Sequence, residues 1–94
     1  MHVPESVRCH LWIRGSVQGV GFRFFAERTA RRLGVSGFTR NLPDGRVETA
    51  VEGSRDAVET FIEAIRAGPS GARVDDLQMT WEAPSGGRGF HIVG

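Results

Sequence analysis

The stretch from Val7 to Leu33, VRCHLWIRGSVQGVGFRFFAERTARRL, determines the fold class because its hydrophobic period changes once. Apolar and polar residues alternate from Val7 to Arg14, which is typical of a strand with one buried face. A glycine-rich loop follows from Gly15 to Gly21. From Phe22 to Leu33 the apolar residues recur at helical spacing, and Gly34 ends the predicted helix.

The rest of the chain shows the same two periods. The turn Leu42-Pro43-Asp44-Gly45 has proline and glycine at the positions that a type I turn favours, so it predicts a hairpin. Gly53-Ser54 predicts the start of a second helix, and Gly68-Pro69 its end. The remaining strands are predicted at about Val35–Arg40, Arg46–Glu52, within Val74–Glu82, and at Phe90–Val93.

The order strand-helix-strand-strand-helix-strand, with a short terminal strand, predicts an α+β fold. Two helices can cover only one face of a sheet, so we expect a ferredoxin-like βαββαβ sandwich with a four- to five-stranded, mainly antiparallel sheet. Right-handed crossovers place strand 46–52 between strands 7–14 and 35–40. They place strand 7–14 between strands 46–52 and 74–82. We expect one domain over residues 1–94, with residues 1–6 as a loose tail.

Composition excludes several classes of protein. The formal net charge of +1 predicts neither a nucleic-acid nor a membrane partner, and no apolar run approaches the roughly 20 residues that a bilayer requires. A single cysteine cannot form an internal disulfide or a CxxC pair, which favours a cytoplasmic location. All 12 basic residues are arginine, so mechanisms that need a lysine are excluded. Residues 1–47 carry eight Arg and three acids, a charge of +5, which indicates a local anion site.

The predicted first helix lacks a side-chain cap. Val20 and Gly21 offer no acceptor for the free amides, and Arg23 places a cation at the positive end of the helix dipole. An anion there would explain both features, because Gly15, Gly19 and Gly21 allow the backbone amides to converge on it. The guanidinium of Arg23 would then bind a phosphoryl group through two hydrogen bonds. The alternative is a hydrated loop with Arg23 in solvent.

Asn41 is the second candidate. Its strand is predicted to be parallel to strand 7–14 and one strand away, so both strands end at the same edge of the sheet. Asn41 can therefore face the loop at Gly15–Gly21. Its side-chain amide both donates and accepts, which suits a residue that orients a water molecule for attack.

Two ordered blocks of the sequence resemble the acylphosphatase family. Gly15-Ser16-Val17-Gln18-Gly19-Val20-Gly21-Phe22-Arg23 is similar to the family signature G-x-V-Q-G-V-x-F-R at every defined position. Gly37-Phe38-Thr39-Arg40-Asn41, followed by Asp44-Gly45-Arg46-Val47 and Gly53, resembles the second block. Thr39 stands where the family more often has valine, and the family's C-terminal aromatic is absent after Val93.

The resemblance implies hydrolysis of small acyl phosphates to a carboxylate and inorganic phosphate, without metal or cofactor. It implies that Arg23 and Asn41 are catalytic, Arg23 by binding the phosphoryl group and Asn41 by positioning the attacking water. It implies that the amides of the loop bind substrate; the loop residues are Gly15, Ser16, Val17, Gln18, Gly19, Val20 and Gly21. A carboxylate leaves without being protonated, so no general acid is required. We expect an oxygen of the substrate's own phosphate, rather than a side-chain base, to accept a proton from the water.

Non-catalytic uses of the same fold remain as alternatives. RNA-recognition domains carry stacking aromatics on the third strand, whereas Arg46–Glu52 has none. A phosphate- or carbamoyl-phosphate-binding module, as in hydrogenase-maturation proteins, belongs to a long multidomain chain. We expect a monomer.

Several other residues are assigned no chemistry. His2, His10 and His91 lack the spacing of metal ligands, and Cys9 lies on the apolar face of its strand. Trp12 and Trp81 are predicted on the helix-free face of the sheet. Phe24 falls outside the apolar stripe of the first helix, where it either flanks the acyl group or packs against a loop.

Overall fold

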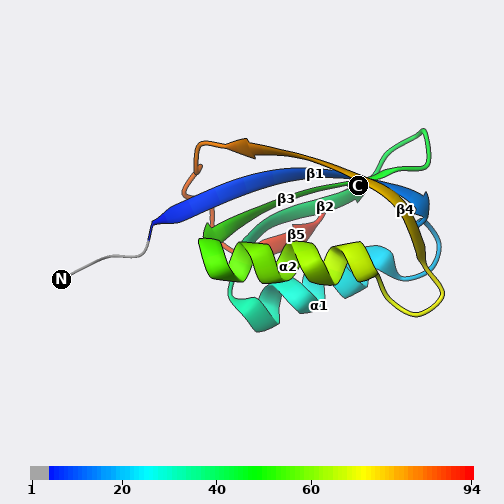
Figure 1. Cartoon of the computed structure of the whole chain (residues 1–94), viewed down its shortest axis with the longest axis horizontal. Coiled ribbons are helices and arrows are strands. Elements are labelled where there is room, and N and C mark those ends of the chain that lie inside the picture. Colours follow the sequence, from blue (N-terminus) through cyan, green and yellow to red (C-terminus); the bar gives the residue numbers. More distant parts are fainter. Residues whose placement is uncertain (1–4) are drawn as a thin grey trace.

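The computed structural model describes residues 5–94 and has the predicted order of elements (Figure 1). The strands are β1 (Ser6–Ser16), β2 (Ser36–Asn41), β3 (Val47–Ser54), β4 (Arg73–Glu82) and β5 (Phe90–Ile92), and the helices are α1 (Phe22–Leu33) and α2 (Arg55–Ala67). Strand β1 is longer than predicted at both ends. Ser6 belongs to it rather than to the expected tail, and the tail residues 1–4 lie outside the described residues.

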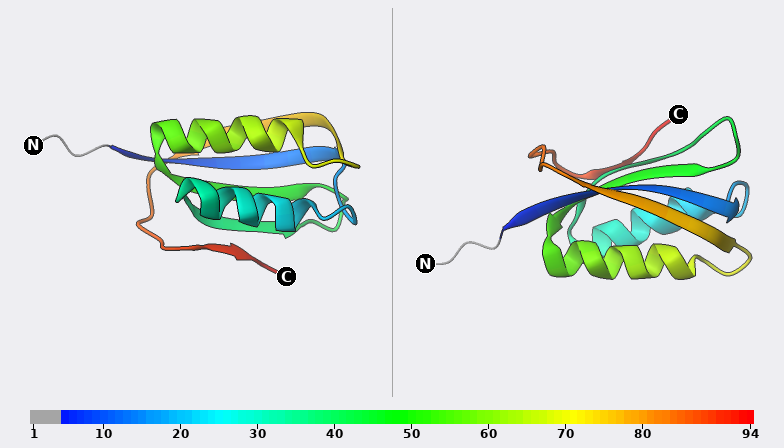
Figure 2. Two further views of the ribbon diagram at one scale, coloured as in Figure 1. Left: turned by 90° about the horizontal axis from the view of Figure 1, so that it is seen from below. Right: turned by 45° about the horizontal axis from the view of Figure 1, so that its top comes forward.

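The five strands form one sheet in the order β4-β1-β3-β2-β5. All neighbouring pairs are antiparallel except β2 and β5, which are parallel. Both helices lie side by side on one face of this sheet (Figure 2), which confirms the ferredoxin-like sandwich. Because β1 and β2 each run antiparallel to β3, they are parallel to one another and end at the same edge.

The core lies between this sheet and the two helices. Cys9, Leu11 and Ile13 alternate along β1 and are fully buried, as the alternation predicted. They share one cluster with buried side chains of both helices, including Phe22 of α1 and Phe61 of α2. Burial of a large apolar side chain contributes roughly 1.5–3 kcal/mol to stability. A shift of β1 by one residue would turn Cys9, Leu11 and Ile13 toward the other face of the sheet. The core therefore fixes the register of β1, and with it the position of the loop that follows.

Trp81 lies on the helix side of the sheet, so its predicted placement on the helix-free face was wrong. It pairs with Cys9 across β1 and β4, and directly paired residues share a face. The guanidinium of Arg55 on α2 lies over its ring, 5.0 Å from the centroid. Trp12 does lie on the helix-free face, where its ring stacks on that of His10 at 4.3 Å.

The helix-free face is partly covered by the connection between β4 and β5. Glu52 of β3 is only 5% exposed and accepts hydrogen bonds from the amides of Ser85 and Gly86, from the Ser85 hydroxyl and from Arg8. Burial opposes ionisation of this carboxyl, but these donors outweigh it and lower the pKa of Glu52 to about 2. The ionised carboxylate thus anchors the connection to the sheet.

We expect stability to depend on pH through Glu52. Its folded-state pKa of about 2 lies below the ordinary value of 4.5, so its contribution is fully present above pH 4.5 and is lost as the pH falls toward 2. The free energy of unfolding of the wild type should therefore fall relative to that of Glu52→Gln across this interval. Chemical unfolding of both proteins at pH 5.5, 4 and 3 measures the difference, and a constant difference would contradict the role of Glu52.

Candidate active site

A cavity of about 160 Å³ lies at the edge where β1 and β2 end. It is lined by residues of the loop, the first turn of α1 and the end of β2: Val17, Gly19, Gly21, Phe22, Arg23, Phe24 and Asn41. The two candidate catalytic residues, separated in sequence, therefore line one cavity. Its volume is several times the roughly 30 Å³ that a water molecule takes in the liquid.

The start of α1 at this cavity is uncapped, as the sequence predicted. Gly21 is the N-cap residue, has left-handed backbone angles (φ 74°, ψ 21°) and makes no side-chain capping bond. Gly19 also has a positive φ, of 76°, whereas Val20 between them does not. Such an alternation turns successive amides toward one side, as in anion-binding nests. Among the described residues, the first-turn amides of Arg23 and Phe24 have no protein acceptor.

Arg23 lines the cavity from the first turn of α1 and is half-buried. Within residues 5–94 no carboxylate lies at ion-pair distance from it, and the first turn contains no acidic residue. By contrast, Arg31 of the same helix pairs with Glu27 at 3.5 Å. The helix dipole and the guanidinium of Arg23 thus place two positive potentials at one end of α1, which favours binding of an anion.

Asn41 reaches the cavity as the last residue of β2. Its Oδ1 is buried and has no hydrogen-bond partner, and among the described residues it is the one buried side-chain polar atom in this condition. An unpaired buried acceptor costs roughly 1–3 kcal/mol, so such an atom in a cavity indicates a donor supplied from outside the protein. The amide oxygen is therefore placed to accept a hydrogen bond from a ligand or a water molecule.

Phe24 is the most exposed large apolar side chain of the described residues, at 58%. It lines the same cavity, directly after Arg23 in the sequence. Of the two positions considered from the sequence, the structure favours the rim of the cavity over packing against a loop.

The predicted loop residues have different roles in the structure. Val17, Gly19 and Gly21 line the cavity, whereas Val20 packs against the core and Ser16 is the last residue of β1. The side chain of Gln18 is directed to the turn between β2 and β3 rather than into the cavity. Gly15 lies in β1, beside an irregularity in its pairing with β4.

The close approach of β4 explains why residue 15 is a glycine. A Cβ atom at Gly15 would lie 2.0 Å from the carbonyl oxygen of Arg73, and the φ of 144° is one that other residues rarely adopt. The structure thus gives Gly15 a packing role that sequence reasoning did not find. The predicted strand before Gly15 contains no proline or glycine, so the sequence gives no local sign of the irregularity between Arg14 and Gly15.

We expect Gly15→Ala to lower the free energy of unfolding by about 2 kcal/mol or more, because the methyl group collides with backbone and the φ is strained. Urea unfolding measures the loss. Gly71→Ala is the matched control, since Gly71 also has a positive φ but open space around its Cβ position. An equal loss in the two variants would show that strain alone, and not the approach of β4, is responsible.

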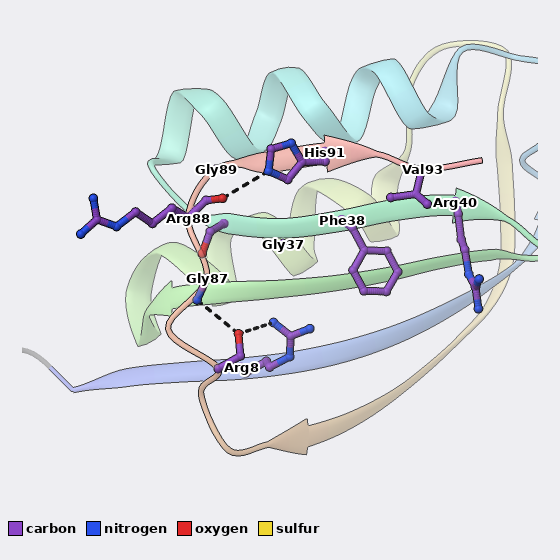
Figure 3. A pocket seen from close by; sticks show the side chains of 11 residues that line it. Arg8, Gly37, Phe38, Arg40, Gly87, Arg88, Gly89, His91 and Val93 are labelled. Carbon is purple, nitrogen blue, oxygen red and sulfur yellow. Dashed lines mark hydrogen bonds between the residues drawn. The ribbon is translucent and has the colours of Figure 1, made fainter.

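A larger cavity, of about 480 Å³, lies on the helix-free face between β2, β5 and the connection before β5 (Figure 3). None of the predicted site residues lines it. Two of its guanidiniums already have carboxylate partners: Arg8 bonds to Glu52 at 3.1 Å, and Arg40 pairs with Glu48. In Figure 3, Phe38 lies in the middle of the view, and the side chain of Arg88 extends away from it. The smaller cavity is therefore the better candidate for anion chemistry.

No cluster of three or more His, Cys, Asp or Glu side chains that could hold a metal ion occurs within residues 5–94. In the same part of the chain, no helix is long and apolar enough to cross a membrane. The cavity itself is lined by a single titratable side chain, that of Arg23.

The family profile of acylphosphatase matches residues 9–92, which include the whole cavity. The chain belongs to the acylphosphatase family. It is 52% identical over 90 residues to the acylphosphatase of Thermococcus kodakarensis, with 96% of this chain and 99% of that one covered. The protein is thus an acylphosphatase enzyme, and its substrate is a small acyl phosphate, as the resemblance of the two sequence blocks implied.

Solved structures agree with this acylphosphatase fold. The crystal structure of acylphosphatase from Bacillus subtilis has a TM-score of 0.91 at 35% identity and covers 94% of this chain and 99% of that one. Full-length HypF in its phosphate- and nucleotide-bound form has a TM-score of 0.88 at 30% identity, but the match covers 99% of this chain and only 12% of HypF. The similarity therefore extends over nearly all of the Bacillus subtilis acylphosphatase but over only a small part of HypF.

Proposed function

We propose that the acylphosphatase binds the phosphoryl group of its substrate at the N-terminus of α1 and that Asn41 positions the attacking water. The observation that carries this mechanism is the buried, unpaired Oδ1 of Asn41 in a cavity shared with Arg23. A water molecule that donates to this oxygen is held beside a phosphoryl group bound by the guanidinium. Such alignment supplies much of the rate enhancement when little covalent chemistry is required.

The phosphoryl oxygens would accept two hydrogen bonds from Arg23 and further bonds from the backbone amides of the loop at Gly15–Gly21. The uncapped helix and the alternating φ at Gly19, Val20 and Gly21 support this assignment. Charge-assisted bonds of this kind strengthen as negative charge develops on the equatorial oxygens in the transition state.

In the proposed step, the oxygen of water forms a bond to phosphorus while the bond from phosphorus to the acyl oxygen breaks. The electron pair of that bond leaves with the carboxylate, and a phosphoryl oxygen receives the proton of the water. The products are a carboxylate and inorganic phosphate. No residue is assigned as a general base, in keeping with a cavity lined by no Asp, Glu, His or Cys among the described residues.

The test of this mechanism is phosphate release from benzoyl phosphate in the presence of a metal chelator. We expect the wild type to turn over benzoyl phosphate at full rate and a simple alkyl phosphate monoester far more slowly, because an alkoxide needs a proton to leave. Comparable rates on the two substrates would contradict a mechanism without a general acid. Loss of activity with chelator, restored by a metal ion, would contradict the metal-free step.

We further propose that the acyl group of the bound substrate extends out of the cavity and contacts Phe24, whose exposed ring lies at the rim. Phe24→Ala should raise the KM for benzoyl phosphate about threefold to tenfold, the effect expected for loss of one aromatic contact. The KM for acetyl phosphate, which offers only a methyl group, should change little. Equal changes for both substrates would place the effect on the phosphoryl group instead.

Three broader properties are also proposed: a single domain, a monomer and a cytoplasmic location. One hydrophobic cluster includes residues from both helices and from β1, β3 and β5, which supports a single domain. Cys9 is fully buried, and burial, followed by the nearby charge of Glu82, raises the pKa of its thiol. Cys9 is the one cysteine of the sequence, so the chain has no internal disulfide, which fits a reducing compartment.

Analytical ultracentrifugation tests the proposal that the protein is a monomer.

A further inference from the structure

The side chain of Gln18 connects the two walls of the candidate active site. Its Nε2 donates one hydrogen bond to the carbonyl oxygen of Leu42, at 2.8 Å, and one to that of Arg46, at 2.9 Å. A carboxamide nitrogen has two hydrogens, so both are used. The loop before α1 is thereby joined to a turn more than 20 residues away in the sequence.

The two acceptors lie at the two ends of the turn that follows Asn41. Within this turn the amide of Leu42 donates to the carbonyl of Arg46 at 2.8 Å, and the amide of Gly45 donates to the carbonyl of Leu42 at 3.1 Å. Asp44 strengthens the turn, since its carboxylate accepts from the Arg46 amide at 3.1 Å and from the Arg46 guanidinium at 2.8 Å. The carbonyls that Gln18 contacts thus belong to a well-ordered element.

On the loop side, the neighbours of Gln18 also fix its position. Val17 is buried in the core with 1% exposure, and Gly19 lines the cavity. On the other side, Leu42 is bonded directly to Asn41. The hydrogen bond from Gln18 to Leu42 therefore joins the residue before Gly19 to the residue after Asn41, and the bond to Arg46 holds the other end of the same turn. Gln18 itself is not among the residues that line the cavity.

We propose that Gln18 is a positioning residue that sets the distance between Asn41 and the phosphoryl group bound at the start of α1. This inference rests on the mechanism proposed above. A glutamine is suited to the task because both of its partners are carbonyl oxygens, which require donors. A glutamate of the same size would direct an acceptor, and a negative charge, at the same two oxygens. Without the two bonds the turn can move, and Asn41 moves with it.

The experiment compares Gln18→Glu and Gln18→Met with the wild type, using benzoyl phosphate as substrate and inorganic phosphate as a competitive inhibitor. We expect kcat to fall about tenfold to a hundredfold in both variants, the order of effect expected for a misplacement near 1 Å. The inhibition constant of inorganic phosphate should change less than about threefold, because Arg23 and the loop amides are untouched. Gln18→Met carries no charge, so it separates the lost bonds from repulsion.

Gln78→Glu is the matched control, since Gln78 is exposed on the edge strand β4, opposite Trp12. It should leave both constants unchanged. Wild-type kcat in both Gln18 variants would overturn the inference, and so would a parallel loss of turnover and phosphate binding, which would indicate direct contact with substrate. If the wild type itself fails to release phosphate, the proposed function fails. Wild-type turnover that is insensitive to residue 18 removes only the role of Gln18.

The side-chain amide resonances of Asn41, the one asparagine in the sequence, give a second readout that does not depend on turnover. We expect them to shift in both Gln18 variants and to stay in place in Gln78→Glu. Unchanged Asn41 resonances in folded Gln18→Met would overturn the inference even if the activity of that variant were reduced.

Discussion

Arg23→Ala should lower kcat/KM for benzoyl phosphate by roughly two to four orders of magnitude. The change removes two hydrogen bonds to a charged group, each contributing about 1.5–3 kcal/mol, and each 1.36 kcal/mol corresponds to a factor of ten in rate. It also removes the cation that adjoins the uncapped start of α1. Affinity for inorganic phosphate should therefore fall together with activity.

Arg28→Ala is the control for this variant, because Arg28 is exposed on the same helix and does not line the cavity. Its kinetic constants should equal those of the wild type. Retention of phosphate affinity by Arg23→Ala would contradict the assignment of Arg23 to phosphate binding. In that case the anion must bind elsewhere, and the larger cavity beside Arg8 and Arg40 becomes the candidate.

Asn41→Ala should reduce kcat for benzoyl phosphate at least a hundredfold while the inhibition constant of inorganic phosphate stays within a few-fold of the wild type. The side chain is proposed to orient water and not to bind the phosphoryl group, so its loss affects the transition state more than the bound product. Removal of a buried unpaired oxygen should not destabilise the fold, and the midpoint of urea unfolding should be equal or higher.

Asn41→Asp extends this comparison. The aspartate keeps an acceptor at the same place but adds a negative charge beside the phosphoryl site, so both phosphate affinity and kcat should fall. Gln78→Ala serves as the amide control outside the site. Full activity in Asn41→Ala would remove the water-positioning role, whereas loss of phosphate affinity without loss of kcat would reassign Asn41 to binding.

The fold could be predicted from the sequence because its strongest signals are local. The alternation of Cys9, Leu11 and Ile13 fixes the buried face of β1, and the helical stripe that begins at Phe22 fixes α1. The shared edge of β1 and β2 follows from the order of elements alone, and it placed Asn41 correctly beside the loop. The topology predicted from the sequence thus brings the two candidate catalytic residues to one cavity.

The features that sequence reasoning missed depend on contacts between distant segments. Gly15 is a glycine because β4 passes close to it, and Gln18 bonds to a turn on the far wall of the cavity. Neither partner can be inferred from the local pattern. Trp81 is different, because it shares the alternation of Leu77 and Met79 and therefore the face of β4 that carries them. That alternation by itself predicts that Trp81 lies on the helix side of the sheet, where Arg55 of α2 covers its ring.

The central claim is that the loop amides and Arg23 together bind a phosphate ion at the start of α1. Titration of the ¹⁵N-labelled protein with inorganic phosphate tests it most directly, because each backbone amide is observed separately. We predict saturable shifts concentrated in the amides from Gly19 to Phe24, which disappear in Arg23→Ala and persist in Asn41→Ala. Shifts that are absent from this segment, or that gather around Arg8, Arg40 and Arg88 instead, would contradict the claim.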